Sequence, residues 1–233
     1  MDTLIHGCGP INIIAIHGIQ GTNRVWLPLA SQLADQCTFI VPNLPGRGAR
    51  KDCSERDMTL ESFTNVIEDT VHKYINDGQS YCLAGWSMGV SVALAFVSQA
   101  QNKQPDKLML LSGVPDISQV SWFTQTTESD LLDEIRKREQ RLKLQDAASH
   151  HAVMWTWRDI ASRSLREQCK SVDVPCLIMS GTQDKDSPLP LVTQFCDLLA
   201  KPTFLTIENA GHSILTENTA AVSAAFTDFL NLE

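Results

Sequence analysis

The sequence predicts an α/β fold with a mostly parallel central sheet and helices on both faces. Short runs of β-branched and aliphatic residues alternate with longer stretches of helical patterning. Such runs suit strands that are buried on both faces, and their alternation with helices is typical of a parallel sheet. Of the 233 residues, 43% are hydrophobic and 20% are charged. These proportions match globular domains and exclude a disordered, collagen-like or coiled-coil protein.

The expected elements follow one another in a regular order. The apolar runs predict strands at 11–16, 37–42, 80–85, 107–112, 174–181 and 202–208. The stretches between and after them predict helices near 25–35, 60–76, 88–101, 188–200 and 217–231. Because crossovers between parallel strands are right-handed, this order restricts the topology to few alternatives.

One long stretch interrupts the alternation. About 60 residues separate the fourth strand from the fifth, and they carry helical patterning near 128–145 and 149–168 without a strand. A structureless loop of that length is uncommon in a compact domain. We therefore expect a core formed by residues 1–113 and 172–233, with residues 114–171 inserted as a small helical lid.

Charge and cysteine content exclude several classes of protein. The net charge is −8, whereas a general nucleic-acid binder is more often basic. No apolar run approaches the roughly 18 residues of a membrane helix, and the N-terminus lacks the features of a secretory signal. The seven cysteines are odd in number, and none has CxxC or zinc-ligand spacing. We expect a reduced, cytoplasmic protein without a metal site, a nucleic-acid partner or a membrane anchor.

The strongest local motif is Gly85-Trp86-Ser87-Met88-Gly89, which follows a predicted strand and precedes a predicted helix. A GxSxG sequence in this context predicts a sharp turn that presents the serine hydroxyl as a nucleophile. The glycines two residues before and after the serine allow the backbone segments to approach each other closely. Ser87 is therefore the candidate nucleophile, and a structural turn with a chance match is the alternative.

A nucleophilic serine requires a base and a carboxylate that orients the base. His212 directly follows the last predicted strand, and Asp184 follows the strand at 174–181. Both loops open at the carboxyl edge of the sheet, where Ser87 also lies. Asp186 is the alternative carboxylate, and either aspartate could instead cap the next helix.

The segment His17-Gly18-Ile19-Gln20-Gly21 follows the first central strand. A turn at this place can direct a backbone N–H at a substrate carbonyl oxygen, and the residue after the nucleophile supplies a second N–H. We therefore expect the amides of Ile19 and Met88 to form an oxyanion hole, with His17 holding the turn by side-chain hydrogen bonds. A phosphate-binding loop is excluded because neither glycine-rich phosphate motif is present.

Together these motifs resemble those of the α/β-hydrolase superfamily. The matches are the His-Gly turn, the segment 42–48, the serine turn, the Gly-Thr-Gln-Asp loop and the Gly-His loop, in the superfamily's order. The resemblance implies the α/β-hydrolase fold and a serine hydrolase that needs no metal or organic cofactor. Asn43 and Val90 depart from the usual motif residues. The short N-terminal leader implies that the initial hairpin is reduced to one strand or is missing.

The predicted lid is basic although the chain is acidic. Residues 136–170 hold nine basic and four acidic side chains, whereas the remainder holds 10 basic and 23 acidic ones. This asymmetry favours an acidic partner, and a solvated helix face is the alternative. On the predicted helix 149–168, Arg163, Arg166 and Lys170 share one face.

Trp86 beside the nucleophile and the arginines of the lid resemble the pimeloyl-acyl-carrier-protein methyl ester esterases of biotin synthesis. In that family lid arginines contact the acyl carrier protein. The resemblance implies carrier-protein contacts for Arg138, Arg141, Arg158, Arg163 and Arg166. Apolar residues of the lid and the nucleophile turn are candidates for substrate binding or for core packing: Trp86, Trp122, Phe123, Met154 and Trp157.

The expected activity is hydrolysis of a carboxylic ester, with the methyl ester of pimeloyl-acyl-carrier protein as the substrate that the resemblance implies. A general short-chain carboxylesterase, a thioesterase and a carbon–carbon bond hydrolase would use the same triad. A receptor or interaction module on the same scaffold is the non-enzyme alternative, because a fold does not determine a function.

Overall fold

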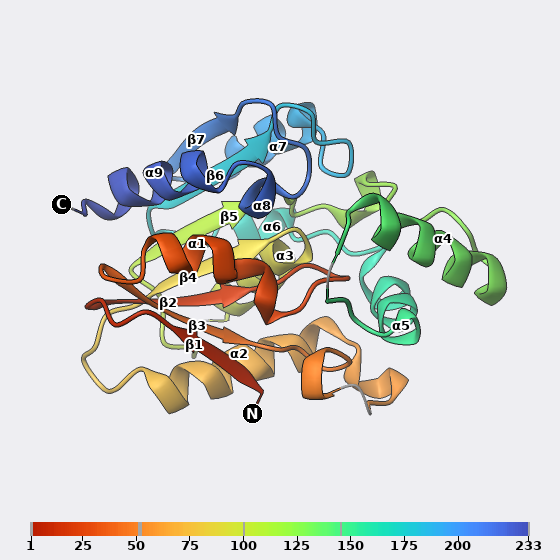
Figure 1. Cartoon of the computed structure of the whole chain (residues 1–233), viewed down its shortest axis with the longest axis horizontal. Coiled ribbons are helices and arrows are strands. Elements are labelled where there is room, and N and C mark those ends of the chain that lie inside the picture. Colours follow the sequence, from red (N-terminus) through yellow and green to blue (C-terminus); the bar gives the residue numbers. More distant parts are fainter. Residues whose placement is uncertain (1, 51–52, 100, 145, 233) are drawn as a thin grey trace.

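The computed structural model describes residues 2–50, 53–99, 101–144 and 146–232 (Figure 1). These residues form a seven-stranded sheet with the strand order β1-β3-β2-β4-β5-β6-β7. The strands are β1 (Thr3–His6), β2 (Ile11–Ile16), β3 (Cys37–Pro42), β4 (Cys82–Trp86), β5 (Lys107–Leu111), β6 (Cys176–Gly181) and β7 (Pro202–Ile207). β1 pairs with β3 antiparallel, and the other paired strands are parallel. The prediction of a mostly parallel sheet is therefore confirmed, and the leader forms one strand.

The strands β2 to β6 are largely buried because both faces of the sheet are covered there, whereas the edge strand β7 is mostly exposed. In β2, Ile13 and Ala15 belong to one buried cluster, while Ile14 and Ile16 belong to the other. Successive side chains of a strand point to opposite faces. The sequence of a strand between two helical layers is therefore a continuous apolar run.

Helices cover both faces, as predicted (Figure 1). One face carries α1 (Leu27–Gln32), α8 (Ile214–Glu217) and α9 (Thr219–Leu230), and the other carries α2 (Leu60–Tyr74), α3 (Met88–Val97) and α7 (Leu189–Cys196). All residues of α3 are buried, so this helix has no polar face. The prediction for 88–101 extends beyond α3 and includes residue 100, which lies outside the described residues. Short 3-10 turns lie at Asn23–Trp26, Gly48–Arg50, Glu55–Asp57 and Ile117–Gln119.

Residues 114–171, which we call the inserted segment, contain three helices between β5 and β6. They are α4 (Glu128–Arg141), α5 (His150–Ile160) and α6 (Arg166–Cys169). Figure 1 shows α4 and α5 beyond the end of the sheet toward which β2 and β3 point. The side chain of Thr127 caps α4 and that of Ser149 caps α5. The division into a core and a lid stays a prediction.

The single helix predicted over 149–168 is wrong. The chain leaves the helix after Ile160, and Ser164 forms an isolated bridge with Asp116. The Leu165 N–H then donates to the carbonyl of Pro115. Pairing with the segment that follows β5 therefore interrupts the helical pattern, and Arg163, Arg166 and Lys170 do not share one helix face.

None of the helices in the described residues is long and apolar enough to span a bilayer. The seven cysteines are free.

Candidate active site

Ser87 stands on a strained turn between β4 and α3. Its φ is 59° and its ψ is −121°, a positive-φ conformation that non-glycine residues rarely adopt. A Cβ on Gly85 would lie 2.3 Å from the Gly89 carbonyl oxygen, and a Cβ on Gly89 would lie 2.4 Å from the Ile16 carbonyl oxygen. Both positions therefore require glycine. This close crossing holds Ser87 at the carboxyl end of the sheet.

His212 reaches Ser87 from the loop between β7 and α8. Its Nε2 lies 2.8 Å from the Ser87 Oγ, and its Nδ1 lies 3.0 Å from Oδ2 of Asp184. With the proton on Nδ1, the ring donates to the carboxylate and accepts from the serine hydroxyl. Ser87 is 2% exposed and His212 is 4% exposed, so bulk water is largely excluded from this contact.

Asp184 is held in place by the loop that follows β6. Its Oδ1 accepts the backbone N–H groups of Asp186 and Ser187, both at 2.9 Å. These bonds fix the orientation of the carboxylate. Of the two aspartates that the sequence left open, Asp184 is the one that contacts His212.

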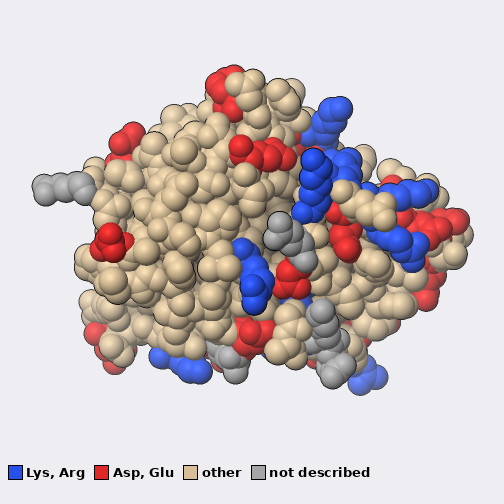
Figure 2. Space-filling view, in the orientation of Figure 1, with Lys and Arg blue, Asp and Glu red and all other residues tan. Residues whose placement is uncertain are grey.

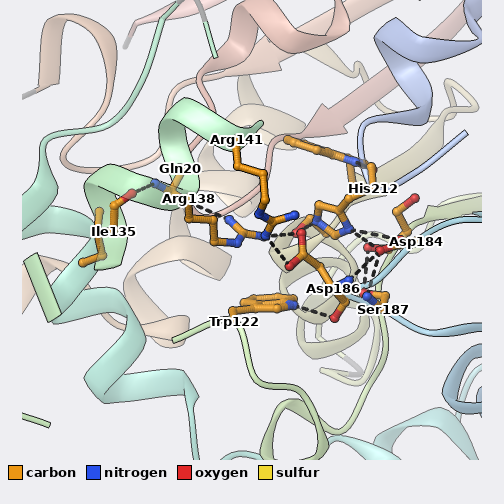
Figure 3. A network of polar contacts seen from close by, with 12 residues as sticks. Gln20, Trp122, Ile135, Arg138, Arg141, Asp184, Asp186, Ser187 and His212 are labelled. Atoms are coloured by element: carbon orange, nitrogen blue, oxygen red, sulfur yellow. Dashed lines mark hydrogen bonds and ion pairs between the residues drawn. The ribbon is translucent and has the colours of Figure 1, made fainter. Parts of the chain in front are cut away.

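Asp186 instead joins this loop to α4 of the inserted segment (Figure 3). Its carboxylate lies 3.3 Å from Nη2 of Arg138 and 2.8 Å from Nη2 of Arg141. Burial raises the pKa of Asp186, but His212, Arg138 and Arg141 more than offset it, so the pKa is lowered. Trp122 Nε1 donates to the Asp186 carbonyl at 2.9 Å. Both the side chain and the backbone of Asp186 thus bind the inserted segment.

Ligand atoms of Asp184, Asp186 and His212 lie within 4.8 Å of one another, a spacing that a cation could bridge. However, two guanidinium groups already contact the Asp186 carboxylate. A metal ion would have to bind beside these two positive charges, which makes the donor set unfavourable for a cation.

The turn after β2 lies against Ser87. A Cβ on Gly18 would be 3.1 Å from the Cβ of Ser87. His17 Nε2 accepts the N–H of Leu44 at 3.1 Å, so Nδ1 carries the proton and donates to the Gly18 carbonyl at 2.9 Å. Burial and the charge of Arg47 lower the pKa of His17 to about 3, which keeps the ring neutral.

The His17 bond also sets the direction of the candidate oxyanion donor. In a trans peptide the carbonyl and the N–H point in opposite directions. Because the Gly18 carbonyl is turned toward His17, the Ile19 N–H is turned away from that ring. Met88 begins α3, where the backbone N–H has no acceptor within the helix.

Three of the predicted substrate-binding residues, Trp122, Phe123 and Trp157, form an aromatic cluster beside His212. The centroid of the Trp122 ring lies 6.4 Å from that of the His212 ring and 5.9 Å from that of the Trp157 ring. Phe123 meets Trp157 edge-on at 5.4 Å, and Met154 is buried in the same core.

Trp86 has a different environment from the other four. It belongs to the apolar cluster on the α1 and α9 face of the sheet. A Cβ on Gly18 would lie 2.9 Å from its ring, and its Nε1 donates to the carbonyl of His212 at 2.9 Å. Trp86 therefore supports the turn at Gly18 and the His212 loop from within the core, rather than lining the cluster around Trp122.

Arg138 departs from the expectation of an exposed carrier-binding arginine. Its side chain is 4% exposed, and its Nη1 donates to Oε1 of Gln20 at 2.6 Å. The guanidinium also lies over the rings of Trp122 and Phe123. The side chain points inward because Asp186 and Gln20 together satisfy its charge and one donor. This placement leaves Arg138 little surface for a partner.

The other four arginines are more accessible, but three of them have acidic partners. Arg141 pairs with Asp186, Arg158 with Glu128 and Arg163 with Asp159. Arg166, at the start of α6, is half-buried. Figure 2 shows basic and acidic side chains interleaved over the end of the molecule that holds α4.

A cavity of about 670 Å³ lies beside the buried site. Its lining includes Gly21 of the turn after β2, Arg141 at the end of α4, and Ser213, which follows His212. Sequence reasoning missed this cavity because Arg24 and Leu142, which also line it, carry no motif. Its lining does not include Ser87, Asp184 or His212.

The sequence also did not predict that Gln20 connects the turn to the inserted segment by hydrogen bonds. Its Nε2 donates to the Ile135 carbonyl of α4 at 2.9 Å, and its carbonyl accepts the Ala148 N–H at 3.0 Å. The only signal in the sequence was its place directly after Ile19. The turn that faces Ser87 is therefore bonded to the segment that covers the site.

A model of the alpha/beta hydrolase family matches residues 13–225. The chain therefore belongs to the alpha/beta hydrolase family, and it is a hydrolase with the fold of that family, as predicted.

Curated relatives include two proteins named pimeloyl-[acyl-carrier protein] methyl ester esterase. The protein of Nitrosomonas europaea is 22% identical, with 89% of this chain and 90% of the relative covered. The protein of Stenotrophomonas maltophilia is 24% identical, with 99% and 96% covered. These matches confirm the predicted resemblance. Among solved structures, a bromoperoxidase from Bacillus anthracis shares the fold, with a TM-score of 0.83 at 15% identity over 98% of this chain and 94% of that one.

Proposed function

We propose that this hydrolase is a serine esterase in which Ser87, His212 and Asp184 form the catalytic triad. The observation that supports this most strongly is the continuous contact from hydroxyl to imidazole to carboxylate, at 2.8 and 3.0 Å, on buried groups. The strained turn, which directs Ser87 at the imidazole, adds to it. A structural turn would require neither the base nor the carboxylate.

The proposed reaction begins when the Ser87 Oγ adds to the ester carbonyl carbon. The hydroxyl proton passes to His212 Nε2, and the carbonyl π electrons move to the oxygen. The N–H groups of Ile19 and Met88 donate to this oxyanion. Asp184 stays ionised and stabilises the imidazolium.

Collapse of this intermediate breaks the bond between the acyl carbon and the alcohol oxygen. His212 returns its proton to that oxygen, and the alcohol leaves. A water molecule then adds to the acyl carbon as His212 Nε2 accepts one of its protons. The bond between the acyl carbon and the Ser87 Oγ breaks, His212 returns the proton to this Oγ, and the acid and the free serine are released. In this scheme Trp122, Phe123, Met154 and Trp157 bind the acyl chain after the inserted segment opens as a lid.

For the substrate we propose the methyl ester of a pimeloyl group carried on acyl carrier protein. The support is the name shared by relatives that align with most of this chain. The carrier surface would include Arg141, Arg158, Arg163 and Arg166, whose charges suit an acidic protein. Arg138 is left out because it is buried.

A short-chain carboxylesterase is the second candidate, and one observation favours it. Arg141, Arg158 and Arg163 already pair with acidic side chains of this protein, so a carrier would have to compete for them. Under this alternative the basic side chains form an ordinary solvated surface.

The deciding experiment compares kcat/KM for the carrier-bound methyl ester with kcat/KM for free dimethyl pimelate, at low and high salt. A carrier preference that fades with salt is the expected result, because electrostatic docking is screened by ions. Arg163→Glu should reduce that preference, whereas Lys73→Glu, at an exposed site near the C-terminal end of α2, should not. Equal values for both substrates at both salt concentrations would contradict carrier docking and leave the short-chain carboxylesterase.

A further inference from the structure

Arg47 is a buried cation next to the turn that faces the nucleophile. It lies in the loop after β3, and its exposed fraction is 0%. Its Nη2 donates to the Ile19 carbonyl and its Nη1 to the Pro45 carbonyl, both at 2.6 Å. The hydroxyl of Thr156 in α5 lies 3.4 Å from both nitrogens. The side chain therefore touches the turn, its own loop and the inserted segment together.

Arg47 has no counter-ion among the residues that the structure describes, where its partners are carbonyls, a hydroxyl, the Met58 sulfur and the Phe63 ring. A buried charge without an ionic partner is unfavourable, so such groups are rare outside functional sites. Burial lowers the pKa of Arg47 to about 9, and the group therefore stays charged at neutral pH. If position 47 served core packing alone, an apolar residue there would stabilise the fold more than a buried charge does.

The contact of Arg47 completes the restraint on Ile19. His17 holds the Gly18 carbonyl on one side of the Ile19 Cα, and Arg47 holds the Ile19 carbonyl on the other. Both peptide planes that flank Ile19 are thus fixed by side chains. Covalent geometry places the guanidinium Nη2 within about 6 Å of the Ile19 nitrogen.

We propose that Arg47 is a positioning residue for the oxyanion hole, which fixes the Ile19 amide and adds a positive potential where the oxyanion forms. In a buried site a fixed charge is screened less than in water. The ground-state ester carries no such negative charge, so Arg47 stabilises the transition state more than the bound substrate. The role rests on the proposed esterase mechanism.

The test uses stopped-flow acylation with a p-nitrophenyl ester, which separates the substrate dissociation constant KS from the acylation rate k2. Enzyme concentrations come from active-site titration, so unfolded protein does not enter the rates. Arg47→Met should lower k2 by about 10- to 100-fold, since loss of a direct oxyanion donor lowers kcat by about 100- to 1000-fold. KS should stay within about twofold of wild type.

A second readout is the inhibition constant of an aliphatic trifluoromethyl ketone, to whose carbonyl Ser87 adds to form a tetrahedral oxyanion. In Arg47→Met this constant should rise by the factor by which k2/KS falls, because transition-state analogues report transition-state binding. A purely structural residue would change the titrated fraction and the melting temperature but neither ratio. Arg56→Met, the same substitution at an exposed site, should leave all constants unchanged.

Arg47→Lys keeps the charge but cannot reach both carbonyls with one rigid fork, so its k2 should lie between those of wild type and Arg47→Met. If Arg47→Met does not fold, Arg47→Gln serves as the uncharged variant. Wild-type k2 and inhibitor affinity in the uncharged variant would overturn the proposal. If wild type does not acylate at all, or if Ser87→Ala still does, the proposed function fails instead.

Discussion

Two carboxylates stand close to the His212 ring, and replacing each by its amide should separate their roles. Asp184 contacts Nδ1 of the ring, whereas Asp186 forms ion pairs with Arg138 and Arg141. We predict that Asp184→Asn loses activity and keeps stability. Asp186→Asn should lose stability and keep most of its activity.

The expected changes in stability and in kcat for Asp184→Asn follow from the contacts that the amide keeps and loses. An amide oxygen can still accept the two backbone N–H bonds at 2.9 Å, so the free energy of unfolding should change by about 1 kcal/mol or less. The negative charge 3.0 Å from Nδ1 is lost, and the amide NH₂ favours the wrong imidazole tautomer. In a serine–histidine–aspartate triad this change lowers kcat by about 10,000-fold.

Asp186→Asn leaves the Arg138 guanidinium buried without its anion. Removing one partner of a buried ion pair costs about 3–5 kcal/mol. For a chain of this size that corresponds to a fall in melting temperature on the order of 10 °C. The backbone N–H that binds Asp184 is retained, so kcat should fall by about tenfold or less.

The assay measures kcat on a short p-nitrophenyl ester together with urea unfolding of wild type and both variants. Asp133→Asn, which removes an exposed aspartate paired with Arg136, serves as the control and should change neither quantity appreciably. The reasoning is refuted if Asp186→Asn loses more activity than Asp184→Asn. It is also refuted if the two variants are equally stable.

Three further predictions concern the supports of the site. Because burial lowers the pKa of His17 to about 3, the unfolded chain binds a proton that the folded chain does not, and stability should fall as pH drops from 6.5. The loss should reach about 2 kcal/mol at pH 5, and His17→Gln should flatten the slope in urea titrations at several pH values. Gly89→Ala, whose Cβ would lie 2.4 Å from the Ile16 carbonyl oxygen, should yield little folded protein by circular dichroism; a variant as stable as wild type would contradict the crossing at the serine turn. Trp86→Phe removes the 2.9 Å bond to the His212 carbonyl and should lower the melting temperature by a few degrees, since the net value of such a bond is about 1 kcal/mol.

The placement of Ser87, Asp184 and His212 could be predicted because each residue follows a strand. Parallel strands end at one edge of a sheet, so residues far apart in sequence meet there. Ser87 and His212 are 125 positions apart and lie in hydrogen-bond contact. The role of the glycines around Ser87 could also be predicted, because glycines two residues before and after the serine allow β4 and α3 to cross closely.

The environment of the charged residues could not be predicted in the same way. Arginine is usually exposed, and a helical pattern does not reveal a partner from a distant loop. Arg138 is buried because Gln20 and Asp186, one before and one after α4 in the chain, both reach it. The break after Ile160 likewise depends on pairing of Ser164 with Asp116, which no local propensity encodes.

Covalent labelling shows whether Ser87 is the nucleophile of this hydrolase. Wild type and Ser87→Ala are incubated with a fluorophosphonate, and the intact mass and the labelled peptide are determined by mass spectrometry. We predict one adduct per wild-type chain, on the peptide that holds Gly85-Trp86-Ser87-Met88-Gly89, and none on Ser87→Ala. An adduct on another residue, or labelling of Ser87→Ala at the wild-type rate, would contradict this prediction.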